Sequence, residues 1–409
     1  MVTNLNKVKN IEAWWNQFPL QLQLITKIRF FTSCGAGGVI YLTSLIFNNI
    51  GLSATEIGIG FTISAIIGTL TRIIAGNYLN KECNIKIPLR LSLLFGFISS
   101  LILLFSYNKI SYLLGQGFIG AAAGIYWPSV EFAVANFSKG IDNRRAYTLV
   151  RSSEATGIFF SVLTGSVLSL LFYIKFVYVI DLIFIFSIFN IIEKQSKNLD
   201  INIASLIQEN TYQKNNDQRE WNKNCFLILI SIVLLTTCLA LIQVTLPLDF
   251  VSGGVRRVAY SNNITGYLIS FQLLLSLLLQ WPIGNWISKK GRLFGLKFSL
   301  FSFGFSSLLL FSSSYLKASG IFLMIIAIIL SSLGTTSFLP SSTDVVYQIA
   351  PSKQKGSALA LLSQCFAMGY FVQIISGRLL DYFGNASNIW IGISLTCFFM
   401  MMILGKKRL

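Results

Sequence analysis

Histidine is absent from the 409-residue sequence, and only 11% of the residues are charged. No two of the cysteines form a CxxC pair, so the chain lacks the residues of a zinc site or of Cys–His catalysis. A GxxxxGK[ST] phosphate loop is also missing, which argues against nucleotide-driven chemistry. The six cysteines are Cys34, Cys83, Cys225, Cys238, Cys365 and Cys397.

The scarcity of charge also excludes an ordinary soluble domain, in which about 25% of residues are charged. Hydrophobic residues make up 54% of the chain, and the mean hydropathy is +0.67. Apolar runs of about 20 residues recur, each long enough to cross roughly 30 Å of hydrocarbon as a helix. These runs are too long and too poor in alternation for barrel strands. The sequence therefore predicts an all-α membrane protein, and the polar first ~23 residues lack the apolar core of a cleavable signal peptide.

Twelve transmembrane helices are predicted from the apolar runs, at about 24–47, 55–79, 88–107, 111–136, 147–171, 174–192, 225–248, 263–287, 293–314, 318–343, 357–380 and 387–404. The net charge of +17 could indicate a nucleic-acid partner. With both termini in the cytoplasm, however, 25 basic residues fall on the inner side and 5 on the outer side, and Arg72 and Arg378 fall inside spans. This asymmetry follows the positive-inside rule. We therefore expect a multi-pass protein of the plasma (inner) membrane and no nucleic-acid partner.

The chain divides into two similar halves. A polar linker at 193–224 separates an N-terminal six-helix half, 1–192, from a C-terminal six-helix half, 225–409. Gly76 and Gly284 lie about half the chain apart, in the similar segments GNYLN and GNWIS. Four further pairs share a single common offset along the chain: Pro128 and Pro340, Ala146 and Ala358, Gly157 and Gly369, Gly165 and Gly377. Two repeated halves about an axis normal to the membrane are a transporter architecture, with the substrate between them.

The two repeated loops resemble the loop that follows the second helix in the major facilitator superfamily. A second resemblance is QGFIGAAAGIYWP, from Gln116 to Pro128, which is similar to that family's fourth-helix motif. The resemblance covers nearly the whole chain and implies a secondary transporter similar to the drug/proton antiporters. Two departures concern the usual gate: Asn80 stands in place of the family's loop aspartate, and Gln116 in place of its arginine.

The repeated loops are the expected gate of such a transporter. Glycine lets helices approach closely, and basic residues can meet the carbonyls at helix C-termini. The alternative is that these basic residues are ordinary positive-inside charges. The predicted gate residues are Gly76, Asn80, Lys81, Gly284, Lys289, Lys290, Gly291, Arg292 and Asp344.

Charges inside predicted spans are costly and usually face a cavity or a partner. Glu131, Glu154, Arg72 and Arg151 are expected at one depth of the N-terminal half, where they could pair. They form either a static network or a proton-coupling site, and Asp181, in the sixth span, is a weaker candidate.

The central helices are expected to line the substrate cavity, although ordinary packing is the alternative for each aromatic residue. The function expected is proton-coupled efflux of amphipathic or drug-like solutes; the alternative is uptake of a small metabolite such as a sugar, by symport or uniport. A membrane-embedded enzyme is disfavoured because no catalytic constellation is visible. The expected partners are a small-molecule substrate, protons and the lipid bilayer, with no cofactor or metal, and the protein is expected to be a monomer. The predicted cavity residues are Tyr41, Tyr126, Trp127, Gln243, Gln272 and Phe338.

Overall fold

The computed structural model describes residues 14–82, 84–138, 141, 143–171, 173–195, 217–290, 293–349 and 355–405. Within these ranges every regular element is a helix. The N-terminal half contains α2 (Leu20–Asn49), α3 (Ala54–Glu82), α4 (Lys86–Leu104), α5 (Lys109–Phe137), α6 (Asn143–Leu170) and α7 (Phe176–Lys194). The C-terminal half contains α8 (Asp217–Ser252), α9 (Asn262–Ser288), α10 (Phe294–Ser314), α11 (Gly320–Ile349), α12 (Lys355–Gly369), α13 (Val372–Phe383) and α14 (Ser387–Gly405).

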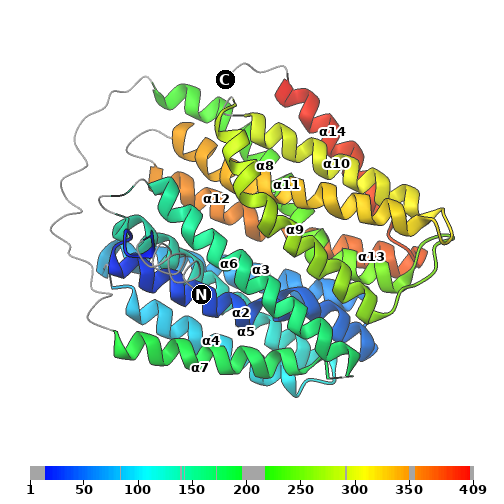
Figure 1. Cartoon of the computed structure of the whole chain (residues 1–409), viewed down its shortest axis with the longest axis horizontal. Helices are drawn as coiled ribbons and strands as arrows, with labels where there is room; N and C mark the ends of the chain where they lie inside the picture. The colour runs from blue at the N-terminus through cyan, green and yellow to red at the C-terminus, as the bar shows by residue number, and fades with distance from the viewer. Residues whose placement is uncertain are drawn as a thin grey trace, which may run out of the picture.

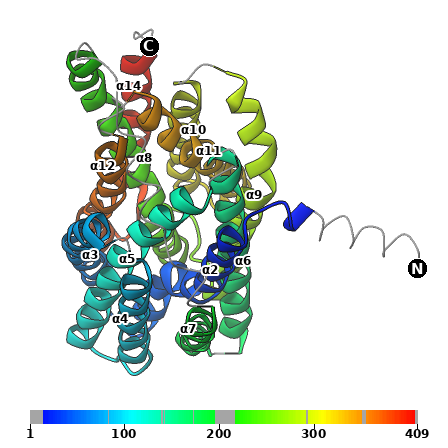
Figure 2. The same cartoon turned by 90° about the vertical axis from the view of Figure 1, so that its left-hand side faces the viewer.

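The two halves form helix bundles that lie side by side; in Figure 1 the N-terminal half is blue to green, and the C-terminal half runs from green at α8 to red at α14. The quarter turn in Figure 2 shows α3, α4, α5 and α7 of the N-terminal half below α8, α10, α11 and α14 of the C-terminal half. The chain passes from α7 to α8 at one end of the molecule, which we call the linker end, and the opposite end is the far end. Helix α8 starts at Asp217, so residues 217–224 of the polar segment belong to this helix.

Eleven helices of the described chain are long and apolar enough to span a membrane. The predicted span 357–380, the eleventh of the twelve, is divided into two shorter helices, α12 and α13. At the division the backbone N–H groups of Tyr370 and Phe371 donate to the carbonyls three residues back, at 3.1 Å each, so the chain tightens into a 3₁₀-like turn. The predicted fold class, twelve transmembrane helices in two pseudo-symmetric halves, is confirmed.

The sequence repeat corresponds to a repeated contact. A Cβ added to Gly157 of α6 would lie 2.7 Å from the carbonyl oxygen of Phe30 in α2. A Cβ added to Gly369 of α12 would lie 2.7 Å from the carbonyl oxygen of Thr236 in α8. The two glycines form one of the pairs of the sequence repeat, so they bring equivalent helix pairs of the two halves into backbone contact.

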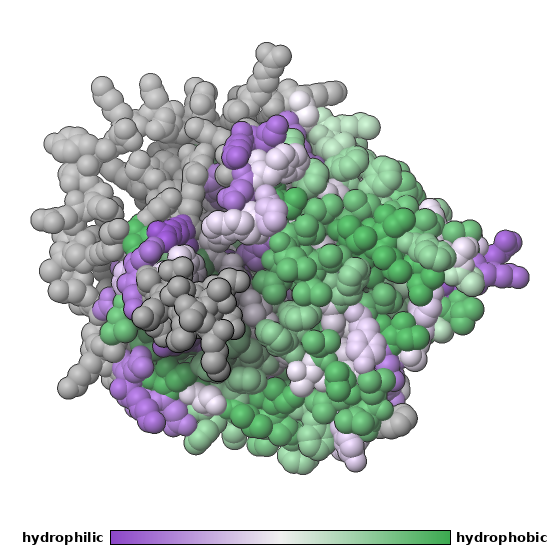
Figure 3. Space-filling view, in the orientation of Figure 1, coloured by the Kyte–Doolittle hydropathy of each residue, from purple (hydrophilic) through white to green (hydrophobic). Residues whose placement is uncertain are grey.

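The outside of the bundle is apolar where lipid would surround it. Large side chains such as Ile74, Phe186 and Phe322 are 66%, 67% and 68% exposed. Figure 3 shows hydrophobic residues over most of the visible face, with hydrophilic residues gathered towards its two ends. An exposed apolar belt between polar ends is the surface that a bilayer requires.

Candidate functional site: the seam between the halves

At the far end the two halves are in close contact along α3 and α13. A Cβ added to Gly58 of α3 would lie 2.2 Å from the carbonyl oxygen of Gln373. The Asp381 carboxylate accepts hydrogen bonds from the backbone N–H groups of Ala54 and Thr55, at 2.9 and 2.8 Å. Asp381 thus caps the first turn of α3 across the seam.

Helices α6 and α9 close the second side of the far end in a similar way. A Cβ added to Gly266 of α9 would lie 2.6 Å from the Ser166 hydroxyl oxygen of α6. Ser169 Oγ donates to Asn263 Oδ1 at 2.7 Å. Asn262 Nδ2 donates to Asn49 Oδ1 of α2 at 2.8 Å. Helices α2, α3 and α6 of one half therefore hold α9 and α13 of the other at this end.

The linker end of α3 and α9 is open. Gly76 follows Gly58 along α3 by about five helical turns, and Gly284 follows Gly266 along α9 by the same distance, so each pair lies on one face of its helix. A Cβ added to Gly76 or Gly284 would meet nothing within 4 Å. The predicted gate glycines thus lie on the helix faces turned towards the other half, and the two halves are apart at these glycines.

Only some of the other predicted gate residues lie within the described part of the chain. Gly291 and Arg292 lie outside the described residues, as do the side chains of Asn80 and Lys81. Lys289 and Lys290 are exposed at the linker end, just beyond α9, and Asp344 is half-buried in α11.

A polar cluster joins the halves between the closed and open ends. Gln243 Nε2 of α8 donates a hydrogen bond to the Tyr41 hydroxyl of α2 at 3.4 Å. The Tyr370 hydroxyl donates to Gln243 Oε1. The Tyr370 ring stacks on Phe61 of α3, with centroids 6.2 Å apart. We call these four residues the seam cluster.

The turn between α12 and α13 lies in this cluster. The Tyr370 carbonyl accepts a hydrogen bond from Thr62 Oγ1 of α3 at 3.4 Å. Interrupted transmembrane helices present side chains and freed carbonyls at the substrate sites of transporters. The sequence predicted Tyr41 and Gln243 but missed Tyr370, because neither proline nor a polar run marks the interruption.

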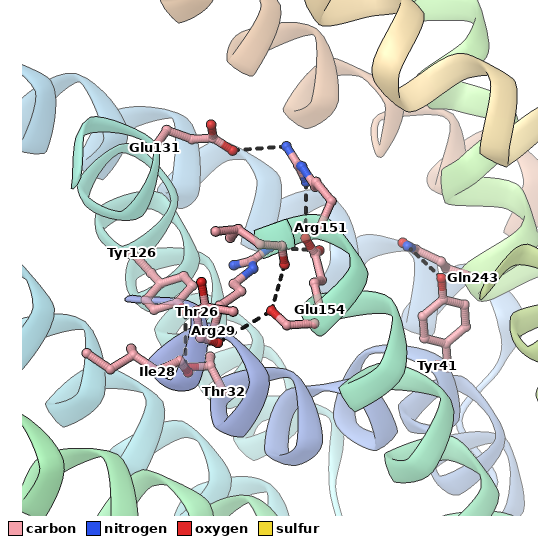
Figure 4. Close-up of polar contacts among 12 residues, drawn as sticks. Thr26, Ile28, Arg29, Thr32, Tyr41, Tyr126, Glu131, Arg151, Glu154 and Gln243 are labelled. Atoms are coloured by element: carbon pink, nitrogen blue, oxygen red, sulfur yellow. Dashed lines mark hydrogen bonds and ion pairs between the residues drawn. The ribbon is translucent and has the colours of Figure 1, made fainter. Parts of the chain in front are cut away.

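Four charged residues form a continuous network in the linker-end part of the N-terminal half (Figure 4). Glu154 of α6 pairs with Arg29 of α2 at 2.7 Å and with Arg151 at 3.2 Å. Arg151 also pairs with Glu131 of α5 at 2.9 Å. Exposure rises along the network, from 4% for the Arg29 side chain and 14% for Glu154 to 28% for Arg151 and 38% for Glu131.

The indole ring of Trp127 lies against both arginines of this network. The guanidinium carbon of Arg29 lies 3.7 Å from the centroid of the Trp127 ring, and that of Arg151 lies 5.3 Å from it. The Tyr126 hydroxyl donates to Thr32 Oγ1 at 3.1 Å, and its ring also faces Arg29. Cation–π contacts of this kind strengthen when they are desolvated. Tyr126 and Trp127, predicted as cavity residues, therefore belong to the charge network.

Two predictions about this network need correction. Arg72 does not join it; Arg72 Nη1 instead donates to the carbonyl oxygen of Ser363 in α12, at 2.6 Å. Arg29 takes the expected place of Arg72. The inner-side count of basic residues includes Arg29, but α2 begins at Leu20, so Arg29 lies more than two turns inside this helix.

The remaining predicted residues lie inside one half. Asp181 of α7 accepts a hydrogen bond from Ser100 Oγ at 2.5 Å, and it packs against Gly35 of α2. Phe338 is fully buried in the C-terminal half, with its ring 5.9 Å from that of Phe366. Gln272 is buried beside Ser332 of α11, whose hydroxyl donates to the Gln272 carbonyl at 3.0 Å. The structure does not bring these residues to the seam cluster.

Comparison with known proteins agrees with this geometry. Residues 225–407 match the sequence model of the Major Facilitator Superfamily. No curated protein sequence matches the chain.

Several solved transporters share the fold. The nucleoside transporter NupG superposes with a TM-score of 0.70 at 14% identity, covering 95% of this chain and 100% of that one. A POT family transporter in complex with 5-aminolevulinic acid gives a TM-score of 0.79 at 11% identity, over 94% and 95% of the two chains. A peptide transporter POT in complex with sulfate gives 0.75 at 12% identity, over 95% of each chain. The C-terminal half thus matches the superfamily's sequence model, and the solved structures show that the chain shares the fold of these transporters.

Proposed function

We propose that this chain is a proton-coupled secondary transporter that moves a small molecule across the plasma membrane by alternating access. The linker end is the cytoplasmic side in this proposal, because the excess of basic residues lies there. The structure is then a cytoplasm-facing state, in which the far end is sealed and the linker end is parted.

The matched glycine pairs carry this proposal. In α3 and in α9, the far-end glycine is too close to the opposing half to accept a side chain, while the linker-end glycine on the same face has open space. A rocking motion would exchange these roles, so that Gly76 and Gly284 approach the opposing half as Gly58 and Gly266 separate from it. A passive channel would need no such matched pairs.

The test blocks closure at one end of the protein and measures from which side of the membrane a labelling reagent reaches the seam. A single cysteine replaces Thr69, which lies on the same face of α3 between Gly58 and Gly76, in a background without the native cysteines. Labelling by an impermeant maleimide is compared in intact cells and in inside-out vesicles. Gly76→Leu is expected to favour labelling from the cytoplasmic side and to stop transport, because leucine prevents closure there.

Gly58→Leu should shift labelling to the outside, because its side chain is incompatible with the backbone of Gln373 in the sealed far end. Gly392→Leu in α14 is the matched control; it also has nothing within 4 Å but lies away from the seam, so labelling and transport should stay unchanged. Equal labelling from both sides in the two seam variants would refute alternating access.

Glu131 is the proposed proton-coupling residue. Glu154 is held between two arginines, whereas Glu131 has Arg151 as its partner and a 38% exposed side chain. A carboxylate with one arginine partner loses less electrostatic attraction when it binds a proton than a carboxylate with two arginine partners. Glu154 then serves to hold Arg29 and Arg151 in position.

The seam cluster is the proposed substrate site. Two phenols, an amide and an aromatic ring suit a small polar solute, whereas the sequence alone favoured amphipathic or drug-like solutes exported by the cell. The groups of the seam cluster support the alternative, a small polar metabolite. The solved transporters of this fold are named for nucleosides and peptides, which are also polar.

A further inference from the structure

Arg72 is half-buried and differs from Arg29, Arg151 and Arg257 in its partners. It lies in α3 on the face that meets the C-terminal half, about one helical turn before Gly76. Its guanidinium crosses the seam to the Ser363 carbonyl at 2.6 Å, and its Nε is buried without a hydrogen-bond partner. Arg72 thus links α3 to α12 about one helical turn before Gly76, where the seam is open.

Among the described residues, Arg72 has no carboxylate partner. Arg29 and Arg151 share Glu154 and Glu131, so the charge network is neutral by itself: two cations and two anions. Arg257, in the C-terminal half, has Asp249. The described part of the seam therefore carries an uncompensated positive charge at Arg72.

Asp181 does not supply the missing anion. Its carboxylate lies among α2, α4 and α7, where it contacts Gly35 and accepts from Ser100. Within the described chain, neither α3 nor α12 is among the helices that pack against α7. A half-buried cation bonded only to a neutral carbonyl loses part of its hydration without gaining a counter-ion, and an anion that arrives there recovers part of that loss.

We propose that Arg72 binds an anionic group, a carboxylate, of the transported solute. The solute would meet Arg72 on the cytoplasmic side of the seam cluster: Thr62, which contacts Tyr370, is ten residues away along α3 (72 − 62), or about 15 Å. A polar metabolite with a carboxylate can thus interact with Arg72 on its route to or from Tyr370 and Gln243. This inference rests on the proposed transport function.

The experiment uses the full-length protein in proteoliposomes and in nanodiscs. Carboxylates are tested in pairs with their carboxamides, such as benzoate with benzamide, for binding and for uptake. We expect carboxylates to bind the wild type more tightly than their amides. Arg72→Gln should weaken carboxylate binding about tenfold or more, as expected for loss of a charge-assisted contact, and should leave amide binding unchanged.

Two variants control for charge and for folding. Arg90→Gln removes an exposed arginine that pairs with Glu193, so the same charge change occurs away from the seam and should not affect binding. Arg72→Lys keeps the charge and should recover part of the carboxylate preference, which a purely structural tie to Ser363 would not predict.

The inference is overturned if no carboxylate of the series binds better than its amide, or if Arg72→Gln weakens both members of a pair equally. Transport that persists in these cases, with side-dependent labelling of the Thr69→Cys protein, would leave the proposed function intact. Loss of side-dependent labelling would instead count against the proposed function itself.

Discussion

Two ion clusters of the described chain differ in how completely water is excluded from them. In the C-terminal half, Arg257 pairs with Asp249 at 3.0 Å, and both side chains are 0% exposed. Trp390 Nε1 also donates to the Asp249 carboxylate, at 3.1 Å, and Arg257 Nη1 donates to Ser313 Oγ at 2.8 Å. In the N-terminal half, the network from Arg29 to Glu131 passes from buried to half-exposed.

The difference separates fixed structure from a group that can change state. The pair in the C-terminal half joins the end of α8 to α10 and α14, within one rigid bundle, and each of its charges has several partners. The network in the N-terminal half has one such fixed part, Arg29 with Glu154, and one open part, Glu131 with Arg151. Graded exposure is what a site needs if one carboxylate is to bind a proton while its neighbours stay paired.

Asp249→Asn should have the largest effect on stability. It leaves the Arg257 guanidinium buried without a counter-ion, which costs about 3–5 kcal/mol. Thermal unfolding of the purified variant measures the loss. Arg256→Gln, at the exposed neighbouring arginine, is the control and should change stability by less than about 0.5 kcal/mol. Equal stability of Asp249→Asn and the wild type would show that the pair is not structural.

Glu154→Gln should have a smaller but clear effect on stability. Arg29 loses its carboxylate but keeps the Trp127 ring, 3.7 Å from its guanidinium carbon, and Glu154 is already 14% exposed. We expect a loss of about 1.5–3 kcal/mol, the range for hydrogen bonds to charged groups. Proton-driven transport by the folded fraction should continue. A variant as stable as the wild type that accumulates no substrate would instead make Glu154 the coupling residue.

The sequence predicted the helices and the two halves well, because span length, charge asymmetry and the repeat are local or additive properties. It also identified Glu131, Glu154 and Arg151, since charges inside apolar runs stand out. The predicted span 24–47 contains Arg29, but its pairing with Glu154 depends on how α2 and α6 assemble, so the sequence did not indicate it. The pairing of Arg257 with Asp249 was missed for the same reason.

The seam was harder to predict for a physical reason. Gly58 and Gly76 resemble other small residues of membrane helices, and their roles depend on which end of the protein is closed. The interruption at Tyr370 lies in a sequence as apolar as its neighbours, and its contacts with Phe61 and Gln243 join residues from both halves. Such contacts between distant segments are set by the assembled bundle.

Glu131→Gln should have the smallest effect on stability and the most specific effect on function. Its ion pair with Arg151 is partly exposed, so its loss should cost less than about 1 kcal/mol. The variant should still exchange substrate down a gradient, because glutamine keeps the size of the side chain. It should lose accumulation driven by a pH gradient, because an amide does not carry the proton.

The matched control for Glu131→Gln is Glu193→Gln. Glu193 pairs with Arg90 at 2.7 Å, and these side chains are 43% and 41% exposed, so the control removes an ion pair of similar exposure away from the seam. It should change neither stability nor coupling. Counterflow and pH-driven uptake in proteoliposomes separate the two transport modes. If Glu131→Gln and Glu154→Gln both keep full proton-driven accumulation, the coupling site is not in this network. Asp181, the carboxylate held by Ser100 in the same half, then becomes the residue to test.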